Sequence, residues 1–175
     1  DRGASKKFII EEVKSDTDFF ELDQKGSRVV IRGNNSVSIA TGLNWYLKYY
    51  AGIHLSWNGM TATLPDVLPP VMKKERHETK LPWRYDLNYC TYSYSMAFWD
   101  WERWEKEIDW MALHGINLPL AITGTETVWY NVLQKLGYNK TEIDEFISGP
   151  GFFAWWLMNN LEGWGGPNPD HWYTQ

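Results

Sequence analysis

The side chains best placed for chemistry lie where two apolar runs end, near the middle of the 175-residue chain. The first run, residues 83–90, alternates in character, so that Asn88 and Cys90 share its polar face just before a polar, aromatic loop. The second run, residues 116–122, is followed by a polar turn that contains Glu126. An amide, a thiol and a carboxylate can all bind polar ligands. We therefore expect a site where these two runs end.

The elements around these residues predict one βαβ unit. Residues 100–114 have the spacing of an amphipathic helix, and Gly115 supplies its C-terminal stop. Strand, loop, helix and strand in this order predict two parallel strands joined by a right-handed crossover. In such units the sites lie in loops at the carboxyl ends of the strands. The apolar stripe expected on the helix consists of Trp101, Trp104, Ile108, Met111 and Ala112, and the carboxylates Glu102, Glu105, Glu107 and Asp109 are expected to be solvated.

Composition excludes several classes of function. The single cysteine, Cys90, excludes an internal disulfide and a cysteine-based zinc site. No base can be assigned to it from sequence, so we do not expect a thiol nucleophile. The net charge of −5 argues against a nucleic-acid surface, which needs a basic patch. We expect no metal, no cofactor, no nucleic-acid partner and no membrane span, because no apolar run reaches the length of a spanning helix.

The aromatic content points toward carbohydrate. The chain has 12 Trp and 10 Tyr, and aromatic residues make up 17% of it. Aromatic rings serve as platforms for the apolar faces of sugar rings, although most tryptophans in any protein lie in the core. Two matches to the N-glycosylation sequon, at Asn34 and Asn139, carry little weight because such matches are common by chance.

The part of the chain before the βαβ unit reads as a small α+β domain. Short apolar runs predict strands, and a helix begins at Ser36 or Ser38 and ends before Gly52. Gly42 inside this helix indicates close packing on a sheet. Four prolines in residues 64–82 predict a linker. The expected division is a domain at 1–63, a linker at 64–82 and a barrel segment at 83–175; the expected strands are 8–13, 19–23, 28–32 and 54–57.

The part after the unit predicts further helices and a glycine-rich wall. Residues 125–136 form one helical pattern, and a capping box from Thr141 predicts a short helix that ends at Ile147. Residues 149–151 and 163–169 are rich in glycine and proline. Long aromatic insertions of this kind more often line a site than link elements.

Two long motifs carry a resemblance to a known family. The run NYCTYSYSMAFWDWERWEKEIDWMALHGINLPLAITGTETVW, followed by EFISGPGFFAWWLMNNLEGWGGPNP, resembles the α-N-acetylglucosaminidase family, glycoside hydrolase family 89. The resemblance implies an α/β fold: a small α+β N-terminal domain and the start of a (β/α)8 TIM-type barrel, truncated here. It also implies a retaining exo-glycosidase that removes terminal α-linked N-acetylglucosamine, outside the cytoplasm. The family's two catalytic glutamates lie on later barrel strands, so we expect them beyond residue 175.

The family's sugar-binding residues can be matched to positions in this sequence. Its pocket motifs match Asn88, Cys90 and Tyr94 in the first run and Trp155 in the second, and Glu126 is the best-placed carboxylate beside them. One carboxylate is not the pair that glycoside hydrolysis needs, so we expect the fragment alone to be inactive. We also expect it to self-associate, because an incomplete barrel exposes strand edges. The alternative is a non-catalytic carbohydrate-binding or accessory module; further βα pattern with two strand-end glutamates would decide between them.

Overall fold

The computed structural model describes residues 3–59 and 63–173, and the chain divides into two compact units. The first unit contains residues 1–86 and 101–118, and the second contains residues 87–100 and 119–175. The helix between the two expected strands therefore belongs to the first unit, whereas the loop before it belongs to the second.

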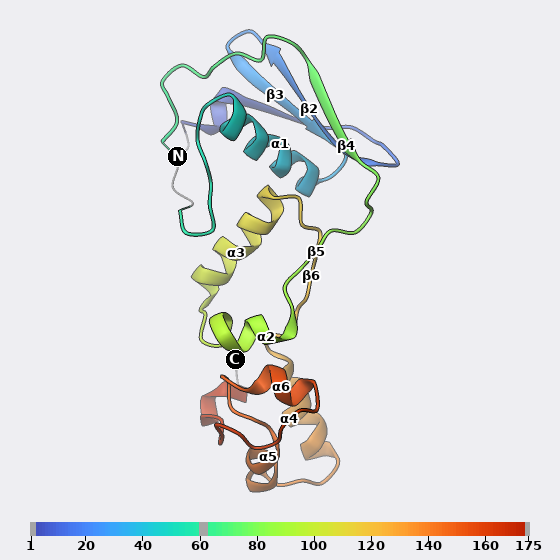
Figure 1. Ribbon diagram of the computed structural model, residues 1–175, viewed down its shortest axis with the longest axis vertical. Helices are drawn as coiled ribbons and strands as arrows, with labels where there is room; N and C mark the ends of the chain where they lie inside the picture. Colours follow the sequence, from blue (N-terminus) through green and yellow to red (C-terminus); the bar gives the residue numbers. More distant parts are fainter. Residues whose placement is uncertain (1–2, 60–62, 174–175) are drawn as a thin grey trace. The chain divides into compact units, whose positions relative to one another are not determined.

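A four-stranded sheet forms the centre of the first unit, in the order β1-β3-β2-β4 (Figure 1). β1 runs parallel to β3, while β2 is antiparallel to both β3 and β4. The first three strands confirm the predicted ones to within two residues, and apolar side chains such as Leu22 and Ile31 are fully buried in them. Their bounds are β1 Phe8–Glu12, after a short 3-10 turn η1 (Ser5–Lys7), β2 Asp18–Lys25 and β3 Arg28–Gly33.

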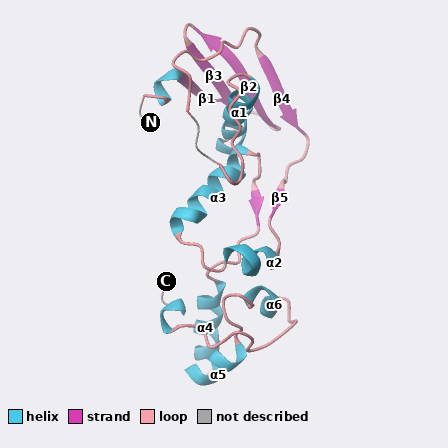
Figure 2. Cartoon of the chain, turned by 60° about the vertical axis from the view of Figure 1, so that its left-hand side comes forward, coloured by secondary structure: helices cyan, strands magenta, loops and turns pink. Residues whose placement is uncertain are grey.

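Helix α1 (Ser36–Tyr49) covers one face of this sheet (Figure 2). Asn35 caps it, since its side-chain oxygen accepts from the Ser38 N–H at 2.9 Å. The expected close packing at Gly42 is confirmed: a Cβ there would lie 3.0 Å from both the Ile31 Cγ2 and the Phe20 Cβ. Only a glycine lets the helix approach the sheet this closely.

The fourth strand is not where the sequence predicts it. Residues 54–57 make only an isolated bridge between Ser56 and Gly59, and the sheet is completed by β4 (Glu75–Thr79). β4 lies within the expected linker, where Leu68 and Val71 are also buried in the core. Its charged sequence lacks apolar alternation because it is an edge strand, whose charged side chains help to prevent further strand pairing.

Helix α3 (Trp101–Leu113) is in contact with α1 in the first unit. The prediction that Glu107 is solvated was wrong: it is only 2% exposed. Its Oε2 accepts from the Trp57 indole at 2.7 Å and from Arg103 at 3.1 Å. These two donors compensate the cost of removing the carboxylate from water. Along the expected apolar stripe, Met111 is buried but Trp101 and Ile108 are exposed.

The two strands of the expected βαβ unit are neighbours, but they are much shorter than predicted. β5 (Tyr85–Asp86) and β6 (Leu118–Pro119) form a two-stranded sheet with α3 between them in sequence. β5 ends because Leu87 adopts a left-handed φ of 72°, which no extended strand tolerates. Pro119 at the end of β6 lacks the N–H needed to extend the ladder.

The second unit is helical (Figure 2). Helix α4 begins and ends within one residue of the predicted helix, while the capping box of α5 starts at Asn139 rather than Thr141. No helix among the described residues is long and apolar enough to cross a membrane. The elements are α2 Tyr89–Thr91, the π-helical turn η2 Tyr92–Met96, α4 Thr125–Lys135, α5 Lys140–Phe146, α6 Phe153–Leu157 and the 3-10 turn η3 Asp170–Tyr173.

Candidate functional site

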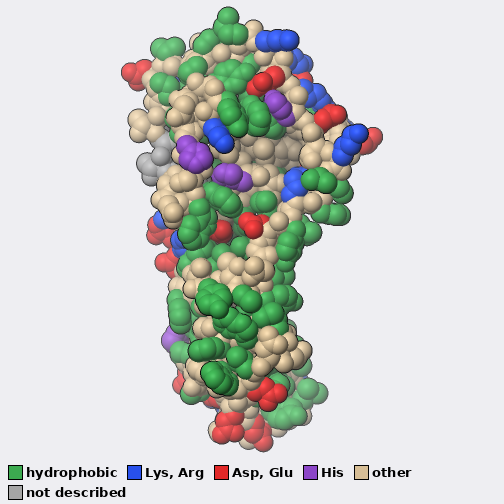
Figure 3. Space-filling view, in the orientation of Figure 1, with side chains coloured by type: hydrophobic (Ala, Val, Ile, Leu, Met, Phe, Trp, Pro, Cys, Tyr) green, Lys and Arg blue, Asp and Glu red, His purple; other side chains and the backbone are tan. Residues whose placement is uncertain are grey.

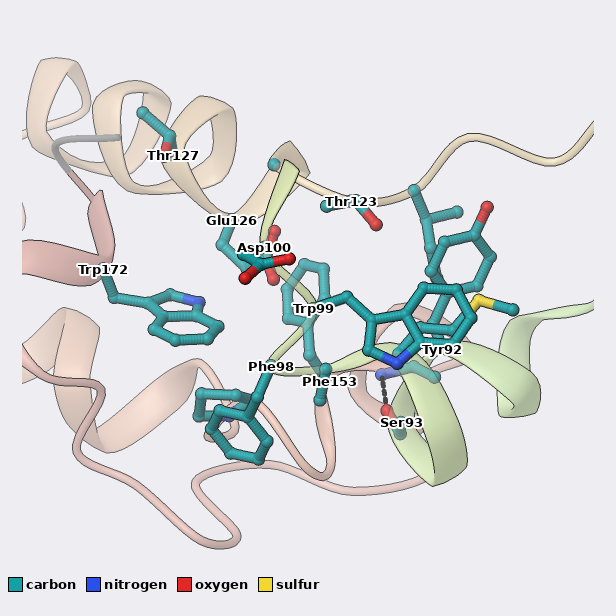
Figure 4. A pocket seen from close by; sticks show the side chains of 16 residues that line it. Tyr92, Ser93, Phe98, Trp99, Asp100, Thr123, Glu126, Thr127, Phe153 and Trp172 are labelled. Atoms are coloured by element: carbon teal, nitrogen blue, oxygen red, sulfur yellow. Dashed lines mark hydrogen bonds between the residues drawn. The ribbon is translucent and has the colours of Figure 1, made fainter. Parts of the chain in front are cut away.

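A cavity of about 310 Å³ lies within the second unit, among η2, the start of α4 and the start of α6 (Figure 4). Its wall combines aromatic rings with two carboxylates and several hydroxyl groups, as sugar-binding pockets do. The π-helical turn η2 contributes one side of it, and π-helical turns are frequent at functional sites. The side chains discussed below that line it are Ser93, Phe98, Trp99, Asp100, Glu126 and Trp172.

Glu126 lies in the first turn of α4 and is the one predicted site residue that lines this cavity. Burial is the main cause that raises the pKa of its carboxyl, and a hydrogen bond donated by the Trp172 side chain only partly offsets that effect. Its Oε2 is buried without a hydrogen-bond partner among the described residues. A carboxyl group in this state is poised to exchange a hydrogen bond with a hydroxyl or amide of a ligand.

The sequence analysis missed several residues of this wall. Asp100 lines the same cavity as Glu126, and Figure 4 shows the Trp172 indole turned toward the two carboxyl groups. Phe98 and Trp172 are in edge-to-face contact with ring centroids 5.8 Å apart, although they lie far apart in sequence. The dense aromatic run before α3 was the available signal for Phe98, Trp99 and Asp100, whereas nothing in the sequence marks Trp172.

Asn88 and Cys90 do not lie on a strand, so the prediction based on strand alternation was wrong. Asn88 is the N-cap of α2: its Oδ1 accepts from the backbone N–H and the hydroxyl of Thr91, both at 3.0 Å. The Asn88 side chain is exposed, and Cys90, one residue into the helix, is a half-buried free thiol. Because the cap uses Oδ1, the Nδ2 donors of Asn88, which have no acceptor among the described residues, can bind a ligand.

Tyr94 and Trp155 lie next to each other although their segments are far apart in sequence: the hydrogen bond between their neighbours Ser93 and Ala154 spans 61 positions. Their rings meet edge to face with centroids 5.1 Å apart, and the Ala154 N–H donates to the Ser93 hydroxyl at 3.1 Å. Tyr94 is 78% exposed, and neither ring lines the cavity that contains Glu126. The predicted residues thus fall into two groups. Asn88 and Cys90 lie at α2 beside the exposed Tyr94 ring and the half-buried Trp155 ring, whereas Glu126 lies in the cavity with its Oε2 buried.

Within the described parts of the chain, no three His, Cys, Asp or Glu side chains gather as a metal site would require. The arrangement is suited to hydrogen bonding and aromatic stacking against a polar ligand with apolar faces.

Two family descriptions match the chain in succession. "Alpha-N-acetylglucosaminidase (NAGLU) N-terminal domain" matches residues 2–70, and "Alpha-N-acetylglucosaminidase (NAGLU) tim-barrel domain" matches residues 84–175. A human relative named "Alpha-N-acetylglucosaminidase" is 46% identical over 163 residues, which are 93% of this chain and 22% of that protein.

Solved structures of a family 89 glycoside hydrolase from Clostridium perfringens share the fold. The complex of that enzyme with 2-acetamido-1,2-dideoxynojirmycin has a TM-score of 0.93 at 43% identity, and it covers 98% of this chain and 20% of its own. A variant with two glutamates changed to glutamine, in complex with its substrate GlcNAc-α-1,4-galactose, has a TM-score of 0.91. The chain therefore spans about a fifth of the length of the relatives it matches.

Proposed function

Because the chain belongs to the α-N-acetylglucosaminidase family, glycoside hydrolase family 89, we propose that it is part of a retaining exo-glycosidase that removes terminal α-linked N-acetylglucosamine from glycans. The observation that carries this proposal is the match of both family domains, in order, over nearly the whole chain. The substrate complex of the Clostridium relative supports the same sugar and linkage. An extracytoplasmic location follows for an enzyme that trims such glycans.

The proposed sugar-binding residues are Asn88, Cys90, Tyr94, Glu126 and Trp155. The contact between the Tyr94 and Trp155 rings supports an aromatic wall, and the capped turn at Asn88 presents an amide beside it. Glu126 adds a carboxyl group whose burial raises its pKa, so that it more readily keeps a proton to donate to a ligand. Asp100 is proposed in addition, because it lines the same cavity as Glu126.

The catalytic glutamates are proposed to lie outside residues 1–175. Retaining hydrolysis needs two carboxyl groups about 5 Å apart, and the chain covers only about a fifth of its relatives. Domain boundaries at 63 and 83 stay a proposal. The barrel-domain match, which begins at residue 84, supports the second boundary, whereas the N-terminal match extends beyond the first, to residue 70.

The 175-residue chain by itself should show no turnover of an aryl α-N-acetylglucosaminide, and it should self-associate. Figure 3 shows apolar side chains gathered over the second unit, where Tyr94, Phe98, Leu136 and Trp164 are all more than 60% exposed. Light scattering and a turnover assay test this. Hydrolysis by the purified fragment that survives a Glu126→Gln change would contradict the proposal, and a stable monomer would contradict the incomplete barrel.

The sugar-binding role of Asn88 is tested in the full-length enzyme, with variants that separate binding from helix capping. Asn88→Ser and Asn88→Asp keep a cap oxygen but lose the Nδ2 donors. We expect both to lower kcat/KM roughly 10- to 1,000-fold, which is about 1.4 to 4 kcal/mol, while the melting temperature changes by only a few degrees. Asn88→Ala should lower both kcat/KM and the melting temperature, since loss of an N-cap costs about 1 kcal/mol. Near-full activity in both capping variants would exclude Asn88 from the sugar site and leave it only a structural role.

A further inference from the structure

The two N-glycosylation sequons have the same motif but lie in opposite structural surroundings. Asn34-Asn35-Ser36 runs from the end of β3 to the first residue of α1 in the first unit, and Asn139-Lys140-Thr141 runs from the N-cap of α5 into its first turn in the second. The sugar in such a modification is attached to the side-chain Nδ2, so the surroundings of that atom decide whether a folded chain can carry it.

Both the Nδ2 and the Oδ1 of Asn34 are hydrogen-bonded within the fold. Its Nδ2 donates to the Asp18 carboxylate at 2.9 Å, and its Oδ1 accepts from the Phe19 N–H at 3.2 Å and the Ser38 hydroxyl at 2.9 Å. Asn34 is half-buried and Ser38 is fully buried. A sugar on Nδ2 would replace one of its two hydrogens directly beside the Asp18 contact, in which Arg84 also takes part. A glycan at Asn34 is therefore disfavoured, because it would have to be accommodated beside a half-buried amide that the fold already holds by hydrogen bonds at both ends.

The Asn139 side chain leaves Nδ2 free. Its Oδ1 accepts from the Glu142 N–H at 3.1 Å, and its backbone N–H donates to the Glu142 carboxylate at 2.8 Å, which completes the capping box of α5. Neither bond uses Nδ2, and no other described residue accepts a hydrogen bond from it. All residues from 134 to 142, including Thr141, are exposed. A glycan on this connection would project into solvent and leave the helix cap intact.

We propose that Asn139 carries an N-linked glycan and that Asn34 does not, when the protein is made in a eukaryotic secretory pathway; this rests on the extracytoplasmic location proposed above. In the reaction, the Asn139 Nδ2 attacks the anomeric carbon of a polyprenyl-diphosphate-linked oligosaccharide. The bond from that carbon to the diphosphate oxygen breaks, an N-glycosidic bond forms, and the amide loses one proton. No electrons are exchanged, and the lipid diphosphate leaves.

The experiment uses the full-length protein secreted from eukaryotic cells behind a signal peptide. Thr141→Ala and Ser36→Ala are a matched pair: each removes one sequon hydroxyl from an exposed position and keeps the asparagine with its hydrogen bonds. After peptide-N-glycosidase treatment in heavy-oxygen water, mass spectrometry should show the labelled aspartate at position 139 and none at position 34. Thr141→Ala should lose this label together with the mass of one glycan, whereas Ser36→Ala should match the parent protein.

The outcomes separate this proposal from the proposed enzyme activity. Secreted, active enzyme with an unmodified Asn139, or with a glycan on Asn34, would overturn the glycan assignment and leave the activity untouched. Secreted protein that is labelled at position 139 but inactive on α-linked N-acetylglucosamine would support the glycan assignment and overturn the function. Asn139→Asp adds a second check, because aspartate keeps the helix cap and cannot be glycosylated. Without enzymatic treatment, this variant should lack the mass of one glycan relative to the parent protein.

Discussion

The Trp57 indole donates to Glu107 across 2.7 Å, and this bond joins the loop after α1 to a barrel helix 50 residues further along the chain. The Arg103 guanidinium completes the arrangement: it donates to the same carboxylate oxygen at 3.1 Å and lies over the Trp57 ring. Residues assigned to two family domains are thus held in one compact unit by a buried carboxylate. The first unit depends on α3 for its own stability.

Replacing Glu107 by alanine should destabilise the protein by about 1–3 kcal/mol, because the Trp57 indole N–H and the Arg103 guanidinium would lose their shared, buried acceptor. Glu107→Gln keeps an acceptor for the indole and should have a smaller effect. Glu102→Ala on the same helix is the control: Glu102 pairs with Lys106 in an exposed i,i+4 position and should change stability by less than about 0.5 kcal/mol. Urea unfolding measures all three. Equal losses for Glu102→Ala and Glu107→Ala would contradict the role of Glu107.

Arg84→Met should destabilise the first unit by about 1.5–3 kcal/mol, the range for hydrogen bonds to charged groups. Arg84 donates to the Asp18 carboxylate at 2.6 Å and to the carbonyl oxygens of Gly115 and Leu81, so one side chain connects β2 with both ends of the βαβ crossover. Arg28→Met, at an exposed position of β3, is the control and should be nearly neutral. Thermal unfolding of the two variants beside the parent protein measures the difference.

The contribution of Asp18 should disappear in acid. Burial alone would raise the pKa of the Asp18 carboxyl, but hydrogen bonds from Asn34 and Arg84 outweigh it and hold the pKa below its ordinary 3.8. A lowered pKa in the folded state contributes stability above the unfolded pKa and loses it as the pH falls through the folded value. Unfolding free energies between pH 6 and pH 2 should therefore fall more steeply in the parent protein than in Arg84→Met. Parallel curves would show that the pair contributes nothing.

Glu126 should have the opposite pH dependence. Burial raises the pKa of its carboxyl above the ordinary 4.5, so ionisation in neutral solution opposes folding. This penalty is absent below the unfolded pKa and sets in as the pH rises toward the folded value. Glu126→Gln should therefore raise the melting temperature at pH 7 and have little effect near pH 3. A variant that melts lower at pH 7 would show that the Trp172 bond to the carboxylate outweighs burial.

Gly42→Ala tests the close contact between α1 and the sheet. Alanine gains about 1 kcal/mol of helix propensity over glycine, but its Cβ would lie 3.0 Å from Ile31 and Phe20, and overpacking costs about 1–3 kcal/mol. The contact with the Phe20 Cβ cannot relax by rotation of a side chain, so we expect net destabilisation. Gly26→Ala is unsuitable as a control because of its positive φ, whereas Ala40→Gly on the same helix reports the propensity term alone. A Gly42→Ala variant that is more stable than the parent protein would show that the sheet can move away from the added methyl group.

Local physics made three helices predictable from the sequence to within about two residues. The helices α1, α3 and α4 each carry their own apolar spacing and a glycine stop or a cap, and these depend only on neighbouring residues. The first three strands were predictable for the same reason, because each is a short apolar run, and in β2 and β3 several consecutive residues are buried. The family motifs also predicted that Tyr94 and Trp155 belong to one site; their rings are in contact, and their part in sugar binding stays a prediction.

Tertiary structure alone decided the features that depend on partners distant in sequence. Glu107 is buried because Trp57 lies above it, and no helical pattern reveals a donor 50 positions away. β4 is a strand because the edge of β2 was open to it, despite its charged sequence. Asn88 leaves the strand because Leu87 turns to positive φ, after which its side chain caps a helix instead of continuing the alternation. Periodicity describes the faces of an element, whereas the burial of a charge and the end of a strand depend on what the rest of the fold places beside them.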